Sequence, residues 1–175
     1  FFNDYKEDPF EGEERLLVPS PTDVSTYDQK PEMSAEQVCQ GVLDQLSGDA
    51  CPEVIIVNFA NPDMVGHTGN LPAIVQAVET VDGCCGRIIE ATLRLGGALV
   101  VTADHGNAER TWNPKRNSPD TAHTTYDVPL HVVGGRLKDN TLRNGGILAD
   151  IAPTVLHLLG ISKPIEMTGR SLVQD

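Results

Sequence analysis

The run EVIIVNF at residues 53–59 decides the fold class of this 175-residue chain. It is continuously apolar and rich in β-branched side chains, which predicts a strand buried on both faces, as in parallel sheets. Two similar runs follow, ALVVTA at residues 98–103 and VPLHVVG at residues 128–134. Strands of this kind separated by long connections predict an α/β domain with a mainly parallel sheet, arranged as a three-layer αβα sandwich.

Helical spacing of apolar residues predicts three helices, which cover residues 34–48, 71–95 and 151–159. Ser34 followed by Gln37 is a capping-box pattern that marks the start of the first helix. Gly96-Gly97 predicts the end of the second helix. Asp150 lies at the N-cap position of the third predicted helix.

Residues 1–31 are polar and contain four prolines, so we predict an irregular lead-in segment with one edge strand at residues 15–19. Residues 32–175 then form one domain. The chain starts without a basic and apolar leader, which predicts no signal peptide. It also starts without Met, so we expect it to belong to a longer protein.

The charge balance is acidic, with 13 Lys and Arg against 25 Asp and Glu, a net −12. This argues against binding to nucleic acid or to anionic membranes. No apolar run reaches the length of a membrane span. The four cysteines show no zinc-type spacing and are expected to be reduced, which fits a cytoplasmic protein; they are Cys39, Cys51, Cys84 and Cys85.

Three short segments carry chemistry at or near the strand ends: Asp63 with His67, Asp104 with His105, and His123. Carboxylates mixed with imidazoles suit divalent ions such as Mn²⁺ or Zn²⁺. Five such ligands exceed the roughly three protein ligands of one open catalytic zinc site. The pattern therefore predicts two metal ions and chemistry on a phosphate or similar oxyanion.

Other polar residues have supporting interpretations. Asn107 and Glu109 are candidate partners of His105 and its ion. We expect His131 and His157 to be packing or surface residues.

A resemblance follows from these segments. They are similar to the metal-binding segments of the cofactor-independent phosphoglycerate mutase family, which lies within the alkaline phosphatase superfamily. The similar stretches run through nearly the whole chain and cover residues 31–35, 58–69, 102–109, 121–125 and 166–172. The resemblance implies an alkaline phosphatase-like fold and the C-terminal part of a phosphatase domain.

The resemblance also implies an isomerase of glycolysis and gluconeogenesis that interconverts 3-phosphoglycerate and 2-phosphoglycerate through a phosphoserine. Its cofactors would be two divalent ions, Mn²⁺ first, with Zn²⁺, Co²⁺ or Mg²⁺ as other candidates. Asp63, His67 and His123 correspond to the ligands of one ion, and Asp104 and His105 to ligands of the other. A small phosphoglycerate would be the only partner, and the whole protein is expected to be monomeric.

The sequence also departs from the family. Three features of that family have no counterpart in this chain: the nucleophilic serine, a further metal-binding Asp and the arginine-rich substrate domain. We therefore expect no catalytic nucleophile in this chain, which would be incomplete without an N-terminal segment, and its substrate-binding residues stay unidentified. Two alternatives remain: a metal-dependent phosphatase or phosphodiesterase of the same superfamily, and an inactive metal-binding fragment.

Overall fold

The computed structural model describes residues 8–137 and 141–174. The α-helices are α1 (Ala35–Ser47), α2 (Asn61–Gly66), α3 (Leu71–Arg94) and α4 (Ile151–Leu158). The strands are β1 (Ala98–Thr102), β2 (Trp112–Asn113), β3 (Ser118–Pro119) and β4 (Leu130–Gly134). The described residues also contain three short 3-10 turns, η2 (Tyr27–Gln29), η3 (Gly135–Leu137) and η4 (Leu148–Asp150).

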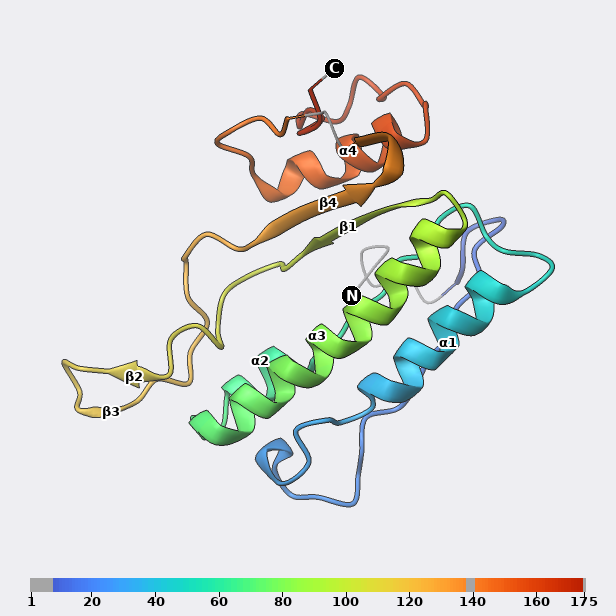
Figure 1. Ribbon diagram of the computed structural model, residues 1–175. Coiled ribbons are helices and arrows are strands. Elements are labelled where there is room, and N and C mark those ends of the chain that lie inside the picture. Colours follow the sequence, from blue (N-terminus) through green and yellow to red (C-terminus); the bar gives the residue numbers. More distant parts are fainter. Residues whose placement is uncertain (1–7, 138–140, 175) are drawn as a thin grey trace.

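The central pairing joins β1 to β4, which run antiparallel with Val100 opposite Val132. The strand pairs of the described residues are antiparallel and do not confirm the predicted parallel sheet, although the α/β class holds. A parallel return needs a crossover, usually a helix. The connection from β1 to β4 contains only the small β2–β3 hairpin, so the chain turns back on itself. In Figure 1 the β1–β4 ribbon runs between α3 and the segment with α4.

The two other predicted strands do not form. Residues 53–59 adopt no regular secondary structure and pair with no strand of the described chain, and residues 15–19 lie in irregular structure. A strand exists only where its backbone N–H and C=O groups meet a partner. Side chains of the first segment still pack: Ile55 and Phe59 lie against the cluster between α1 and α3.

Helices α1 and α3 pack side by side around one of two core clusters (Figure 1). That cluster contains Ala35, Cys39, Val42, Cys84 and Ile88. All four cysteines of the chain are free thiols. Burial and the neighbouring Cys39 raise the pKa of Cys84 to about 12, so this thiol stays protonated and behaves as an apolar core group.

The ends of the long helices agree with the predictions to within about a residue, but one cap differs. The Ser34 hydroxyl donates to the Pro19 carbonyl and makes no capping bond, so the predicted capping box is absent. Gly96 follows α3 at φ +73°, a backbone angle that favours glycine. The predicted end of α3 at Gly96-Gly97 is therefore confirmed.

The second core cluster lies behind α2. It consists of Met33, Val65, Ala73, Ile74 and Ala77, with Val65 coming from α2 and the last three from α3. Because Val65 lies between Asp63 and His67 in sequence, this cluster fixes the turn that carries both side chains.

Truncation of this cluster should destabilise the fold. Ile74 is 3% exposed, so Ile74→Ala is expected to lower the free energy of unfolding by about 2–5 kcal/mol. Val75, the next residue, is 47% exposed, and Val75→Ala should change it by less than about 0.5 kcal/mol. Urea denaturation of the two variants measures this difference. Equal effects would mean that the cluster behind α2 is not a core.

The C-terminal segment is held by one buried carboxylate. Asp150 precedes α4, yet its side chain makes no helix cap. It accepts hydrogen bonds from the backbone N–H groups of Arg170 and Ile147 and from the Arg143 guanidinium. These hydrogen bonds, that from Arg170 first, lower the pKa of Asp150 to about 2. Arg170 thus attaches the tail through its backbone N–H.

The fold exposes much surface for its size. Its accessible area is 12,097 Å², whereas a compact 18.9 kDa monomer is expected to expose about 8,300 Å². Several large apolar side chains are more than half exposed; examples are Leu17, Ile56, Ile147 and Ile165. None of the helices described is long and apolar enough to cross a membrane.

Candidate metal centre

Helix α2 presents two of the predicted ligands on one face. Asp63 and His67 are one helical turn apart, and His67 Nε2 lies 3.2 Å from Asp63 Oδ1. The start of the helix is fixed by the buried Asn61, whose side-chain amide donates to the carbonyls of Pro31 and Glu32. The i, i+4 spacing therefore produces the expected pairing of side chains.

His123 reaches the same point from a distant loop. Its Nε2 lies 3.0 Å from Asp63 Oδ1 and 3.1 Å from His67 Nε2. Three potential ligand atoms thus form a nearly equilateral triangle, although 56 residues separate the two histidines.

The tautomer of His67 makes this triangle suited to a cation. His67 Nδ1 lies 2.7 Å from the Thr121 carbonyl. A carbonyl can only accept, so Nδ1 is the donor in this contact, and Nε2 is the ring nitrogen that faces Asp63 and is placed to bind an ion. Metal-ligating histidines commonly donate their second ring N–H to a carbonyl in this way.

The side lengths of the triangle can be compared with coordination geometries. Six ligands at about 2.1–2.2 Å from an ion place neighbouring ligand atoms about 3.0–3.1 Å apart, whereas a tetrahedral ion with ligands at about 2.0–2.2 Å separates them by about 3.3–3.6 Å. The observed 3.0–3.2 Å fits one face of a six-coordinate ion. Two imidazoles and one carboxylate on one face leave positions open for other ligands.

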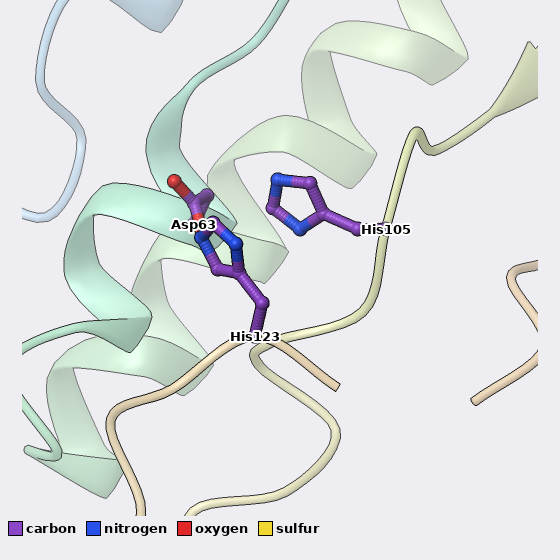
Figure 2. Close-up of side chains that lie close together, drawn as sticks. All are labelled: Asp63, His105 and His123. Atoms are coloured by element: carbon purple, nitrogen blue, oxygen red, sulfur yellow. The ribbon is translucent and has the colours of Figure 1, made fainter. Parts of the chain in front are cut away.

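His105 joins the cluster from the loop after β1. Its ring stacks on His123 with centroids 3.8 Å apart, and ligand atoms of Asp63, His105 and His123 lie within 4.8 Å of one another. Figure 2 shows these three side chains converging beside α2. Asp104 lies apart: its side chain is 87% exposed, and its Oδ2 is 3.8 Å from His105 Nε2. The structure therefore brings four of the five predicted ligands together and places the fifth at the rim.

Asn107 contacts the site differently from the expectation. Its side-chain amide donates to Asp63 Oδ1 at 2.7 Å and does not bond to His105. The residue is buried and packs against Gly66. A Cβ at position 66 would lie 2.5 Å from Asn107 Oδ1, so glycine is required for this approach. No local sequence pattern indicates this link between the loop after β1 and α2.

Glu109 joins the two loops that carry His105 and His123. Its carboxylate accepts the Asn107 N–H at 2.8 Å and a short hydrogen bond from the Thr124 hydroxyl. Burial acts to raise the pKa of Glu109, but these hydrogen bonds outweigh it and hold the pKa below the usual 4.5. Thr124 N–H also donates to the Gly106 carbonyl at 2.8 Å, which fastens the loops together.

The remaining histidines have no part in the cluster. His131 is exposed on β4 and His157 is half-buried in α4, in agreement with their interpretation as surface or packing residues.

Comparison with known proteins defines the class of this protein. The family model of the metalloenzyme superfamily matches residues 1–163, and the chain belongs to this superfamily. More particularly, it is similar to 2,3-bisphosphoglycerate-independent phosphoglycerate mutases. It is 60% identical to that of Rhodopirellula baltica and 52% identical to that of Syntrophotalea carbinolica, each over 99% of the chain.

A solved structure agrees with these relatives. The fold matches a crystal structure of Leishmania mexicana phosphoglycerate mutase at low cobalt concentration with a TM-score of 0.79 and 30% identity, over 90% of this chain. The match supports the expected alkaline phosphatase-like α/β class. The chain covers 31% of that structure and spans about a third of the length of the curated relatives, 32% and 33% for the two named.

Proposed function

We propose that the protein containing this chain interconverts 3-phosphoglycerate and 2-phosphoglycerate, and that the chain supplies its metal-binding part. The observation that carries the proposal is the meeting of Asp63 Oδ1, His67 Nε2 and His123 Nε2 at 3.0–3.2 Å in a chain 60% identical to such a mutase. The acceptor atoms of these side chains converge, and a cation is what stabilises such a group.

Each predicted ligand has a role in this proposal. Asp63, His67 and His123 hold one divalent ion, and Asp104 and His105 contribute to a second. Mn²⁺ is the first candidate because it accepts both carboxylates and imidazoles with six ligands, while Zn²⁺, Co²⁺ and Mg²⁺ are tested beside it. Bound ions would neutralise phosphoryl oxygens and lower the pKa of a nucleophilic hydroxyl.

The nucleophile itself is proposed to be a serine outside these 175 residues. Among the described residues, no serine hydroxyl bonds to Asp63, Asp104 or the three clustered histidines. In the proposed reaction the serine oxygen takes the phosphoryl group from one glycerate oxygen, and the other glycerate oxygen then receives it. The substrate is a small phosphoglycerate, and the site is proposed to act in a cytoplasmic monomer.

The finer architecture is also a proposal. We propose that in the complete protein residues 53–59 form a parallel strand of a three-layer sandwich, with residues 1–31 as a lead-in to the domain of residues 32–175. Ile55 and Phe59 pack on the same cluster as Leu99 of β1. Covering the exposed apolar side chains would also bring the surface area toward that of a compact domain.

Metal removal tests the activity. The full-length gene product should lose mutase activity after chelation, measured directly by ³¹P NMR of 3-phosphoglycerate, 2-phosphoglycerate and inorganic phosphate, because its catalytic charge stabilisation depends on the ions. Added Mn²⁺ should restore the activity. Full activity of a protein shown to be metal-free would contradict the proposal.

Two alternatives give different outcomes in the same assay. A phosphatase would release inorganic phosphate from 3-phosphoglycerate faster than it forms 2-phosphoglycerate. A metal-binding module would bind Mn²⁺ without either reaction, and this is the outcome expected of the 175 residues alone.

A further inference from the structure

We propose that Asn107 is a positioning residue for Asp63, whose carboxylate it holds in the orientation that meets His67 and His123. The inference rests on the proposed metal site and deepens it. In this assignment the side chain of Asn107 supports Asp63, although His105 is much closer to Asn107 in sequence.

The Asn107 side-chain amide donates two hydrogen bonds to Asp63. Nδ2 lies 2.7 Å from Asp63 Oδ1 and 3.3 Å from the Asp63 carbonyl oxygen, so both contacts are to one residue of α2. The orientation of the amide is fixed by chemistry. A flipped amide would place its oxygen against two acceptors, because a carboxylate and a carbonyl donate nothing.

In this orientation the oxygen of the Asn107 amide goes without a hydrogen bond. Asn107 is 5% exposed, and its Oδ1 is buried without a hydrogen-bond partner. That oxygen is pressed against Gly66, where any Cβ would overlap it. Buried acceptors without donors are rare. We therefore attribute the position of the Asn107 amide to its Nδ2 group, which donates to Asp63.

The backbone of Asn107 is anchored as firmly as its side chain. The Asn107 N–H donates to Glu109 Oε2, and Glu109 Oε1 accepts the hydroxyl of Thr124, the residue after His123. Asn107 thereby connects all three segments of the site: α2, the loop of His105 and the loop of His123. Movement of any one segment would be transmitted to the Asp63 oxygen.

Mn²⁺ titration of the 175-residue chain tests the assignment, with free Mn²⁺ followed by electron paramagnetic resonance. Asn107→Ala should weaken Mn²⁺ binding roughly 10–100-fold, the usual effect of removing an outer hydrogen-bond partner of a ligand. Asn107→Leu has a similar size but no donor and no charge, and it should bind no more tightly than Asn107→Ala. Co²⁺ absorption bands of Asn107→Ala should shift, because the geometry around the ion changes.

Two control variants separate positioning from general destabilisation. Asn70→Ala removes an exposed amide that bonds to Asp28, and it should leave Mn²⁺ affinity unchanged. Thr154→Ala removes a fully buried hydroxyl in α4, far along the chain, and it should lower the melting temperature without changing Mn²⁺ affinity at low temperature.

The outcomes distinguish this inference from the proposed function. Wild-type affinity in Asn107→Ala or Asn107→Leu would overturn the positioning role alone. An equal loss of affinity in Thr154→Ala would also overturn it, because the effect would then follow stability. Absence of Mn²⁺ binding by the wild-type chain would overturn both the metal site and the role of Asn107.

Discussion

Replacing His123 with alanine is expected to weaken Mn²⁺ binding by more than about 100-fold, because loss of a direct ligand should exceed the 10–100-fold typical of outer partners. The substitution removes one corner of the ligand triangle and the ring on which His105 stacks. Activity of the full-length product should fall with the affinity. Isothermal titration with Mn²⁺ and the ³¹P NMR assay measure the two effects.

The fold should tolerate this change. The His123 side chain is 50% exposed and belongs to neither core cluster, so the melting temperature of the metal-free chain should hardly move. His131→Ala is the matched control, since His131 is exposed on β4 away from the cluster. Mn²⁺ affinity within twofold of wild type in His123→Ala would remove this residue from the ligand set.

Replacing Asp150 with alanine is expected to lower the melting temperature by roughly 6–20 °C, the range for breaking a buried ion pair in a chain of this size. The variant leaves the Arg143 guanidinium, only 16% exposed, without its carboxylate. It also leaves the backbone N–H groups of Ile147 and Arg170 unpaired. Differential scanning calorimetry measures the change, and Asp49→Asn on the exposed surface is the control.

The same carboxylate should make stability depend on pH. Its folded pKa of about 2 lies below the ordinary 3.8, so the carboxylate stabilises the fold above about pH 4. This contribution is lost as the pH falls through about 2. The difference in melting temperature between wild type and Asp150→Ala should therefore shrink between pH 4 and pH 2. A constant difference over that range would show that the ionised carboxylate is not what holds the C-terminal segment.

The helices could be predicted because their signals are local. Apolar spacing and Gly96 defined α3 to within a residue, and β1 was found from its β-branched run. Strand pairing could not be predicted in the same way, because it depends on which partner is present. Residues 53–59 have the composition of a buried strand but meet no partner in the described part of the chain.

The site was predictable where ligand type and spacing carried the information. The i, i+4 pair of Asp63 and His67 formed as expected, and His123 joined it from 56 residues beyond His67. The contacts that orient these ligands were not predictable. They depend on a backbone carbonyl at Thr121 and on the approach of Asn107 to Gly66, which are properties of the folded chain.

The segment of residues 53–59 lies just before α2, the helix that carries Asp63 and is followed at once by His67. Its backbone amides have no partner among the residues described, so they are expected to exchange with solvent almost without protection. Any strand that pairs with this segment would steady the approach to α2 and favour metal binding. By thermodynamic reciprocity, a bound ion would favour that pairing equally, so sheet completion and metal affinity would form one linked equilibrium.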